Sequence, residues 1–580
     1  MRHSDTFATP AFAAAVLAPT LLAYNLSPSA TLLNQLLSVA GWGVVLVAMR
    51  ARGGLAAPQG ATLWAALAAL ALAVVVSMHG GLPSPLALSS LALLAAAAAV
   101  AWHGAAGSPR QTDDVLAFHQ AMLLAGLAST VIALLQVFLP SWTDGSVIAR
   151  SGLPGRAVGN LRQPNHLSSL LLWGLIAWVP VAQAGRWLGL TLGRRLALVL
   201  AALLVWALVL TASRTGMLGV LLLALWGAVD KRLARWLRVA LMCAPVAYLI
   251  FWGGMSAWSH LTSQTFGGEA RLAENDMSSS RMGILLNTLA MIKAQPWFGV
   301  GFGEFNFAWT LSAFPGRPVA FFDHTHNLPL QLFVELGVPF GLLVLALLLA
   351  ALWQAARRAW AVQGESGTLA RAAFMVVLMI GLHSLTEYPL WYAYFLLPTA
   401  WAWGCALRRV EPVETFVVMR AVLPNPALRV AGALLLCGAL FAAYDYWKVV
   451  VIYSPTEGSG PLAERVERGQ GSVFFSHHAD YAAATTTEPP SQAMAAFSST
   501  THTLLDTRLM LAWAQALAES GHRDKASYLA ARLREFRNPA SANFFEVCND
   551  PVRREAKPPP FQCEAPPAHL GWRDFLPRSE

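Results

Sequence analysis

Charged residues are scarce in this chain. They make up 12% of its 580 residues, whereas hydrophobic residues make up 56%. An ordinary soluble protein has about 25% charged residues. So few charges exclude a cytosolic enzyme, a disordered protein and a nucleic-acid-binding domain. The net charge of +9 comes from 40 Lys and Arg against 31 Asp and Glu, and we attribute it to the inside loops of a membrane protein, which are rich in Lys and Arg.

Cysteine is also rare, with five residues in the chain. Cys243, Cys405 and Cys437 lie in apolar runs and are typical of small hydrophobic side chains. Cys548 and Cys563 lie 15 residues apart in a polar tail, where a disulfide would require an oxidising compartment. The sequence contains no CxxC motif and no Cys/His spacing of a zinc site.

Long apolar runs dominate the rest of the sequence. A helix needs about 20 apolar residues to cross a bilayer. Thirteen candidate segments lie near 9–24, 31–49, 61–78, 84–103, 115–139, 166–184, 196–212, 214–229, 237–256, 327–353, 372–388, 391–407 and 428–448. The seventh and eighth could form one broken helix, which reduces the count to twelve. Arg2 and His3 precede the first run as in a signal peptide, but the following runs favour an uncleaved first helix.

Basic residues orient these segments. With the N-terminus inside, each inside loop contains Lys or Arg, in agreement with the positive-inside rule. These residues are Arg50, Arg52, Arg110, Arg186, Arg194, Arg195, Lys231, Arg232, Arg235, Arg238, Arg357, Arg358, Arg371, Arg408, Arg409 and Arg420. The same count places two loops outside and, with thirteen segments, also the tail.

The sequence therefore predicts an all-α polytopic membrane protein with about 12–13 transmembrane helices. We divide it into a first transmembrane region over 1–256 with an outside loop at 140–165, a large outside loop over 257–326, a second transmembrane region over 327–450 and a soluble helical tail over 451–580. Residues 508–536 of the tail have the periodicity of a tetratricopeptide-like helical hairpin around Gly521. One hairpin is not a repeat array.

Five arginines lie on the outside by this count. They are Arg150, Arg156, Arg162, Arg214 and Arg281. The guanidinium group matches the geometry of phosphate oxygens. Each arginine alone is equally consistent with snorkelling to headgroups or with pairing to a distant carboxylate. Five of them on one face favour an anionic ligand, namely a lipid diphosphate.

A polar segment, Gly159-Asn160-Leu161-Arg162-Gln163-Pro164-Asn165-His166, precedes the sixth apolar run. Its proline is suited to the first turn of a helix. Asn160, Gln163, Asn165 and His166 either hold sugars or phosphates, or cap the membrane helix. In residues 296–305, glycines alternate with aromatics, which permits close approach to a ligand but equally a tight packed turn.

The sharpest motif, Asp323-His324-Thr325-His326-Asn327, opens the tenth apolar run, and Glu335, Gly337 and Gly341 follow it. A histidine at a membrane boundary can act as a general base near neutral pH. A helix N-terminus disfavours a protonated imidazole and favours bound anions. The motif therefore favours a neutral base beside a phosphate. A structural histidine is the main alternative; a metal site is disfavoured, because His324 and His326 are two apart and no second cluster supports them.

The following apolar run closes with His383, Ser384, Glu387 and Tyr388. His383 and Glu387 are four residues apart and are expected to share a helical face. Ionisable groups within a membrane are functional candidates, although these two could equally form a structural pair.

These motifs resemble the O-antigen ligase and polymerase superfamily. His326-Asn327 followed by Gly337 is similar to the family's signature, which implies that His326 is its essential histidine. Arg214 in TASRTG and Arg281 in SSSRMG match the two outside arginines of that family. Residues 159–166 and the long tail resemble one branch, the bacterial protein O-oligosaccharyltransferases of the pilin glycosylation ligase type.

The resemblance implies en bloc transfer of a glycan from undecaprenyl diphosphate to Ser or Thr of periplasmic proteins such as pilin, with inversion and with neither cofactor nor metal. It implies a multi-pass protein of the bacterial inner membrane whose active site faces the periplasm. His326 would be the catalytic base, and Arg214, Arg281 and Arg162 would bind the diphosphate. The residues expected to support or position substrates are Asn160, Gln163, Asn165, His166, His324, Asn327, Glu335, Glu387 and Tyr388.

Two alternatives stay open. The acceptor could be lipid A core, as in an O-antigen ligase, or another glycan chain, as in a polymerase. A transporter or flippase for the same lipid-linked glycan would use His383 and Glu387 as a proton relay. Such transporters typically have internally repeated broken helices, and no convincing repeat relates the two halves of this chain. No interaction with nucleic acid is expected.

Overall fold

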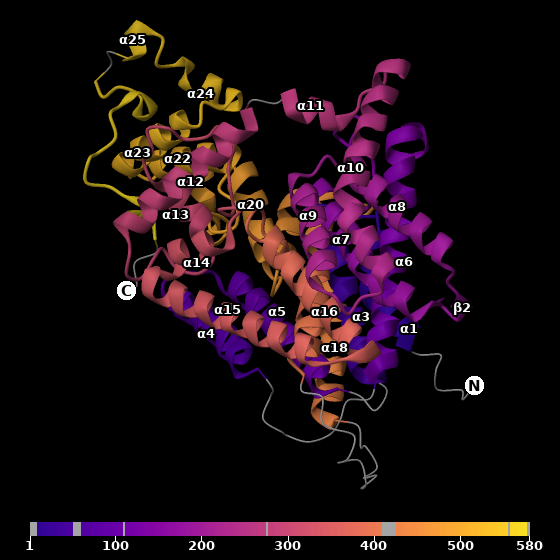
Figure 1. Ribbon diagram of the computed structural model, residues 1–580. Coiled ribbons are helices and arrows are strands. Elements are labelled where there is room, and N and C mark those ends of the chain that lie inside the picture. The colour runs from indigo at the N-terminus through magenta and orange to yellow at the C-terminus, as the bar shows by residue number, and fades with distance from the viewer. Residues whose placement is uncertain are drawn as a thin grey trace. The chain divides into compact units, whose positions relative to one another are not determined.

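The computed structural model describes residues 8–49, 60–107, 111–273, 276–408, 425–554 and 557–576. Within these ranges the regular secondary structure is almost entirely helical (Figure 1), and β1 (Arg186–Trp187) pairs antiparallel with β2 (Leu190–Thr191) in one short ribbon. Several predictions concern residues outside the described ranges, namely Arg2, His3, Arg50, Arg52, Arg110, Arg409 and Arg420.

Eight helices in the described ranges are long and apolar enough to cross a membrane. They are α4 (Ala61–His79), α5 (Ser84–Ala106), α6 (Gln111–Phe138), α7 (Pro164–Ala184), α10 (Arg235–Thr262), α15 (Val338–Ala361), α16 (Gly364–His383) and α18 (Pro426–Tyr453). Shorter helices lie among them in sequence: α1 (Ala8–Phe12) and α2 (Ala18–Leu21), joined by a π-helical turn, α3 (Leu32–Ala48), α8 (Arg194–Leu210), α9 (Arg214–Val229) and α17 (Ala393–Leu407). The predicted all-α polytopic membrane fold is confirmed. A helix suits this environment because it satisfies its own backbone hydrogen bonds in lipid.

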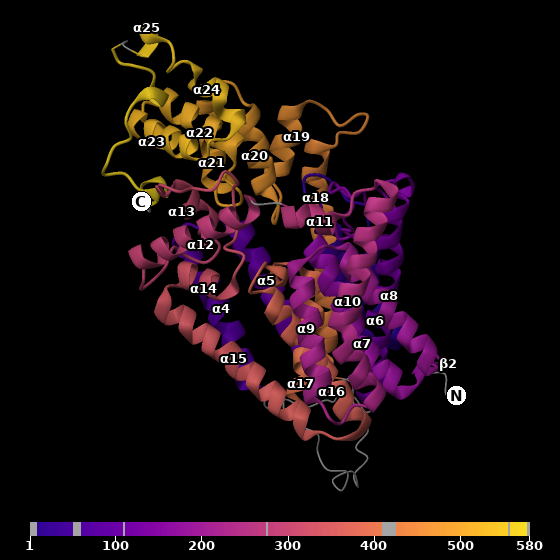
Figure 2. The ribbon, with the colours of Figure 1, turned by 45° about the horizontal axis from the view of Figure 1, so that its top comes forward.

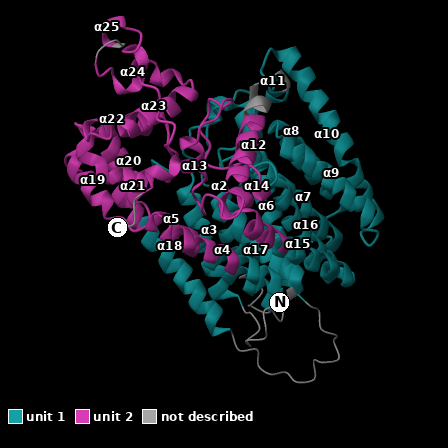
Figure 3. Ribbon diagram, turned by 90° about the vertical axis from the view of Figure 1, so that its left-hand side faces the viewer, with its two compact units in different colours: residues 1–67, 93–274, 347–443 teal, residues 68–92, 275–346, 444–580 magenta. Residues whose placement is uncertain are grey.

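The chain divides into two units, shown in Figure 3. Unit 1 comprises residues 1–67, 93–274 and 347–443, and unit 2 comprises residues 68–92, 275–346 and 444–580. In unit 1, α7 packs against α6, α8, α9 and α16. For this reason 89% of its apolar stretch is buried, against 22% for α10. The helix that follows the polar segment 159–166 is therefore the centre of unit 1.

Unit 2 joins the large loop to the tail. The loop helices are α11 (Gly267–Ala273), which still belongs to unit 1, then α12 (Asp276–Ala294) and α13 (Phe305–Leu311), and α14 (Leu328–Leu336) follows directly after the loop. The tail helices are α19 (Leu462–Gln470), α20 (Ser476–Thr486), α21 (Met494–Thr500), α22 (Thr507–Glu519), α23 (Arg523–Glu535), α24 (Ala542–Glu546) and α25 (Pro551–Arg554). Figure 2 shows α20 to α23 gathered together in the tail. The helical hairpin predicted around Gly521 is formed by α22 and α23.

One hydrophobic core connects the loop and the tail within unit 2. Phe305, Phe307 and Trp309 of α13 are completely buried in the same cluster as Leu509 and Leu533 of the hairpin. Polar contacts between the loop and the tail accompany this core. His502 Nδ1 lies 2.7 Å from Glu304 Oε2, and Arg317 Nε donates to Glu535 Oε2 at 3.1 Å. The segment before the histidine motif thus folds together with the tail.

Two of the predicted membrane helices differ in the structure: one is interrupted and one ends earlier. The run over 327–353 is two helices, because Gly337 between α14 and α15 has a φ of 75°, which is outside the helical region. The run over 372–388 already ends at His383. Pro389 disfavours further helix, and the hydroxyls of Ser384 and Thr386 donate to carbonyls of the last turn.

The prediction for Arg371 is also wrong. Instead of lying in an inside loop, it lies within α16 and is 1% exposed. Its Nε donates to Asp230 Oδ2 at 2.6 Å, and the indole of Trp226 donates to the same oxygen. A buried guanidinium requires such a carboxylate partner. Arg371 therefore ties α16 to the end of α9.

Helices α5 and α17 cross at two glycines of unit 1. A Cβ on Gly404 would lie 2.1 Å from the carbonyl oxygen of Ala101, and a Cβ on Gly104 would lie 2.4 Å from that of Trp401. Small residues at such crossings let helix backbones touch, which is a major source of packing energy in membranes. This contact tolerates no added methyl group.

We therefore predict that Gly404→Ala destabilises the protein by about 1–3 kcal/mol, the usual cost of overpacking. The measurement is the thermal unfolding midpoint of the detergent-solubilised protein. Gly381→Ala is the matched control, because Gly381 also lies within a helix but a Cβ added there would meet open space. There the higher helix propensity of alanine should leave the midpoint unchanged or raise it. Equal midpoints for the two variants would contradict the close crossing.

Candidate active site

Three helices that carry predicted site residues begin in the same way. The caps are Gln163 for α7, Ser213 for α9 and Asn327 for α14. In each case the cap side chain accepts a hydrogen bond from the backbone N–H three residues later. This satisfies one of the free N–H groups at the start of the helix. The predicted helix start at Pro164 is confirmed.

The residue before each cap has a left-handed backbone. Its φ is 59° at Arg162, 49° at Ala212 and 55° at His326. This conformation is uncommon for residues other than glycine and is enriched at functional sites. The three strained residues coincide with the three motifs: GNLRQPNH, TASRTG and HTHN. In each motif the chain turns sharply just before a helix begins. Two of the strained residues, Arg162 and His326, are predicted site residues.

The histidine motif of unit 2 is held in place by two buried side chains of α14. The backbone N–H of Thr325 donates to Gln331 Oε1 at 2.8 Å, and Gln331 Nε2 donates to Glu335 Oε1 at 2.9 Å. Gln331 and Glu335 are 3% and 6% exposed. The residue next to His326 is therefore fixed by a hydrogen-bond chain that ends at a carboxyl group.

Sequence reasoning missed Gln331. The signal was present, because Asn327, Gln331 and Glu335 are spaced four apart and so lie on one face of the helix. The first caps the helix, the second holds the backbone of Thr325, and the third anchors the second.

The glycine-rich segment packs against the end of α14. Gly299, Gly301 and Gly303 all have positive φ. The N–H groups of Val300 and Gly301 donate to the carbonyls of Val334 and Glu335, both at 2.9 Å. A Cβ on Gly299 would lie 2.5 Å from the latter oxygen, so that position requires glycine. The sequence allowed either close approach to a ligand or a tight packed turn, and the structure shows this segment as a turn packed on α14.

Electrostatics distinguish the two carboxyl groups near the histidines. Burial raises the pKa of Glu335 to about 7, although His324, the N–H groups of Gly303 and Phe305 and the Gln331 side chain act in the opposite direction. Burial also acts to raise the pKa of Asp323, but the hydrogen bond and charge of His324 outweigh it and lower that pKa overall. His324 Nδ1 lies 3.2 Å from Asp323 Oδ1. Asp323 is therefore ionised at neutral pH, whereas Glu335 is partly protonated there.

His326 itself is half-buried, and its ring is perpendicular to that of Phe322 at 5.6 Å. Arg281, another predicted site residue of unit 2, lies on α12, which packs against α14. Its spacing from the buried residues Ile284, Thr288 and Met291 places it on the inward face of α12.

In unit 1, most predicted ligand groups of the segment 159–166 bond to the protein's own backbone. The amide of Asn160 accepts from the N–H of Ala149 and donates to the carbonyls of Leu21 and Val147. Arg162 donates to the carbonyls of Ala23 and Gly145. Arg150 and Arg156 also donate to carbonyls, those of Thr143 and Thr211. These contacts fix the shape of the loop over residues 140–165.

Arg214 differs from these arginines. It is the first residue of α9, it is exposed, and within the described part of the chain its guanidinium has no hydrogen-bond or ion-pair partner. Its neighbours are fixed: Ser213 donates to Asn165 Oδ1 at 2.7 Å, and Thr215 bonds to Thr386 at 2.9 Å. A fixed backbone with a solvated guanidinium suits an anion from solution or lipid.

Glu387 and His383 do not act as the expected helical pair. Because α16 ends at His383, Glu387 lies in the following turn, where its Oε1 accepts from Asn165 Nδ2 at 2.9 Å. His383 Nδ1 instead bonds to Ser169 Oγ at 2.8 Å. The helix is thus shorter than expected, but the two residues stay adjacent, because the backbone N–H of Glu387 donates to the carbonyl of His383 at 3.0 Å.

His166 and Tyr388 occupy an aromatic layer beside this network. His166 is buried, and its Nδ1 lies 3.2 Å from the hydroxyl of Tyr394. The Tyr388 ring stacks on Tyr392 at 6.1 Å. Tyr394 and Ser213 are contacts that sequence reasoning missed. No group of three His, Cys, Asp or Glu that could hold a metal occurs among the residues that the structure describes.

The raised pKa of Glu335 predicts a pH dependence of stability. The folded chain binds this proton more tightly than the unfolded chain, so the free energy of unfolding should fall as the pH rises from the usual value of 4.5 to about 7. The slope is at most about 1.4 kcal/mol per pH unit. In Glu335→Gln this contribution disappears. Thermal unfolding of both proteins across this range checks the difference, and parallel curves would contradict it.

Comparison with known protein families gives three matches. Residues 157–179 match the protein glycosylation ligase family, residues 199–346 match the O-antigen ligase family, and residues 371–544 match the C-terminal part of the virulence factor membrane-bound polymerase family. The first contains the cap of α7, the second contains Arg214, Arg281 and the histidine motif, and the third contains Glu387.

Two relatives come from Acinetobacter baylyi (strain ATCC 33305 / BD413 / ADP1). A general O-oligosaccharyltransferase is 25% identical over 351 residues, which cover 59% of this chain and 59% of the relative. A ComP-specific O-oligosaccharyltransferase is 25% identical over 268 residues, which cover 44% of each chain. The similarity thus spans less than two thirds of either relative. These matches make the chain similar to proteins of the O-antigen ligase superfamily and, among them, to O-oligosaccharyltransferases.

Proposed function

We propose that this protein transfers a glycan en bloc from an undecaprenyl diphosphate carrier to Ser or Thr hydroxyls of periplasmic proteins such as pilins. The transfer inverts the configuration at the sugar carbon and uses no metal. The glycosylation ligase match at residues 157–179 and the two O-oligosaccharyltransferase relatives support a protein acceptor. The active site is proposed to face the periplasm from the inner membrane.

The observation that carries this proposal is the geometry of His326. It has a strained φ of 55°, it directly precedes the cap of α14, and Gln331 and Glu335 fix the turn beside it. The imidazole is thereby held at the start of α14. His326 would therefore accept the proton of the acceptor hydroxyl as that oxygen attacks the sugar carbon. Asn327, His324 and Glu335 would keep it in position.

The diphosphate leaves as the glycosidic oxygen takes up negative charge. Arg214 and Arg281 would bind it and stabilise that charge, which is usually the largest contribution in such reactions. Arg162 is the weaker candidate, because its guanidinium already bonds to two carbonyls. Asn165 and Glu387 would orient the start of α9 through Ser213, while Asn160, Gln163, His166 and Tyr388 would maintain the surrounding loop and helix ends.

A second candidate function keeps the donor and changes the acceptor. The matches to the O-antigen ligase and membrane-bound polymerase families favour lipid A core or a growing glycan in that place. The transporter alternative is less well supported, because its proposed relay groups, His383 and Glu387, bond to Ser169 and Asn165 respectively.

We predict that His326→Ala nearly abolishes transfer, because a positioned base contributes about 10²–10⁴-fold. The assay expresses the protein with a periplasmic pilin in a bacterium that makes a lipid-linked glycan and lacks its own ligase, and the intact pilin is weighed by mass spectrometry. His522→Ala, at an exposed histidine of the tail, is the matched control. Arg214→Ala should also abolish transfer, with partial recovery in Arg214→Lys.

A glycan-sized mass gain on the pilin with His326→Ala would contradict the assigned role. No gain with the wild type, in a host where a known ligase modifies the same pilin, would indicate lipid A core as the acceptor. Transfer by the purified protein should persist in EDTA. Its loss, with recovery on adding Mg²⁺, would contradict the metal-independent mechanism.

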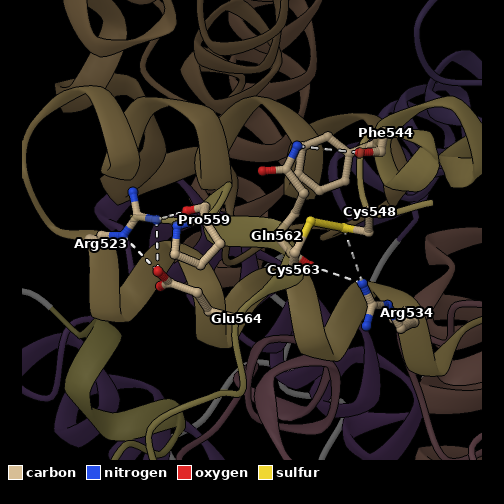
Figure 4. The surroundings of a disulfide bond; sticks show 8 residues. All are labelled: Arg523, Arg534, Phe544, Cys548, Pro559, Gln562, Cys563 and Glu564. Atoms are coloured by element: carbon tan, nitrogen blue, oxygen red, sulfur yellow. Dashed lines mark hydrogen bonds and ion pairs between the residues drawn. A yellow bond between two sulfur atoms is a disulfide. The ribbon is translucent and has the colours of Figure 1, made fainter. Parts of the chain in front are cut away.

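The tail contains a disulfide between Cys548 and Cys563 (Figure 4). Arg534, beside it, donates to the carbonyl of Gln562 at 2.9 Å. Disulfides form and persist in oxidising compartments. This supports the proposal that the tail lies in the periplasm, as the count of thirteen segments also predicts.

We predict that both tail cysteines react with a membrane-impermeant maleimide in spheroplasts, but only after an impermeant reductant is added. The protein for this test has Cys243, Cys405 and Cys437 replaced by Ala, so that the tail thiols are the only targets. Labelling without reductant would contradict the disulfide. Labelling only after cell lysis would place the tail in the cytoplasm.

A further inference from the structure

Unit 2 contains a pocket of about 470 Å³ that none of the proposed catalytic residues lines. Phe321 forms one wall, the start of α22 forms the second, and the segment after α23 forms the third. The residues used below are Phe321, Thr507, Arg508 and Leu511. The volume lies within the range of about 300–1,000 Å³ that is usual for ligand sites.

The pocket is coupled to the histidine motif through consecutive residues. Phe321 stacks on Phe536 with ring centres 3.9 Å apart, and the ring of the next residue, Phe322, contacts His326. Asn306 connects the backbone beside two of the pocket walls. Its Nδ2 donates to the carbonyl of Phe322 at 2.7 Å, and its Oδ1 accepts from the N–H of Leu505 at 2.9 Å. A molecule in the pocket therefore lies on the rigid approach to His326.

Thr507 gives an independent sign of a ligand. It lines the pocket, it is 8% exposed, and its hydroxyl has no hydrogen-bond partner within the described residues. Buried hydroxyl groups nearly always have a partner, so an orphan beside a cavity points to a polar group that arrives with a ligand. The neighbouring Asp506 is already satisfied, since it accepts from the N–H of Leu509 and the hydroxyl of Tyr481.

The lining indicates a polypeptide rather than a sugar. Phe321 and Leu511 form an apolar wall of the pocket. Val319 and Leu504, which lie two and three residues in sequence from the lining residues Phe321 and Thr507, are also exposed apolar side chains. Such a surface gains from an apolar side chain, which a glycan does not have. Arg508 is exposed at the edge and makes one long hydrogen bond, 3.3 Å to the carbonyl of Thr485, so that its charge is available to a carboxylate.

We propose that this pocket binds the acceptor protein at a segment beside the reacting Ser or Thr. It takes an apolar side chain against Phe321 and Leu511 and an acidic side chain at Arg508, and Thr507 bonds to the backbone of the segment. This inference rests on the function proposed above. It makes the tail the part of the chain that selects the acceptor.

The test measures transfer kinetics with the full-length protein in detergent, an undecaprenyl-diphosphate-linked glycan and a pilin that the wild type modifies. Arg508→Glu, Leu511→Asp and Thr507→Val should each raise the KM for the pilin, the first two by about tenfold. The kcat and the KM for the lipid-linked glycan should change less than about twofold, a factor within about 0.5 kcal/mol, the size of an ordinary surface substitution. Arg553→Glu, an equal charge reversal at an exposed tail arginine outside the pocket, is the matched control.

A second experiment tests the proposed contact between Arg508 and an acidic residue of the pilin. When acidic residues near the modified site of the pilin are changed to Lys, the wild type should lose efficiency and Arg508→Glu should regain it. Thr507→Val preserves the shape of the side chain, so it reports on the hydroxyl even if Leu511→Asp fails to fold.

Three results would overturn the inference. A higher KM for the glycan donor with an unchanged KM for the pilin would make this a glycan pocket. Unchanged constants in both Arg508→Glu and Thr507→Val would make it an empty surface feature. Absence of transfer to any protein by the wild type would instead reject the proposed function, and the inference with it.

Discussion

Capping of helix starts is the constraint on which the rest of this structure depends. A helix in a membrane satisfies its backbone internally, except for the N–H groups of its first turn. At α7, α9 and α14 a side chain supplies one missing acceptor, and the residue before it is strained into the left-handed region so that the chain can enter the helix sharply. The same N–H groups and the same end of the dipole attract anions. One physical requirement therefore explains both the stability of the motifs and their suitability for phosphate chemistry.

The strain at these turns is offset by rigid surroundings. In unit 1, Asn165, Ser213 and Glu387 connect the start of α9 to α7 and to the turn after α16. In unit 2, Gln331 and Glu335 fix the turn beside His326. The core that α13 shares with the tail hairpin stabilises the approach to that turn. The tail is thus part of the support of the histidine motif in unit 2.

Much of the organisation could be read from the sequence. Apolar runs long enough to cross a bilayer predicted the membrane helices, because burial in lipid requires them, and the polar residues at their starts predicted Gln163 and Asn327 as boundary residues. The break at Gly337 and the end of α16 at His383 were not predicted, because hydropathy does not distinguish a helix from an apolar turn. Arg371 was misplaced for a related reason: its carboxylate partner, Asp230, is 141 residues away in sequence.

The sequence by itself determined the membrane class, the helical fold and the motifs that are proposed to carry the chemistry, since these depend on composition and on short spacings. Only the tertiary structure decided which polar groups are already satisfied. Asn160 and Arg162 bond to backbone carbonyls, whereas Arg214 projects without a partner among the described residues. It also revealed Gln331, Tyr394 and the pocket beside Phe321. Hydrogen bonds and cavities join residues far apart in the chain, so their formation depends on packing and not on local pattern.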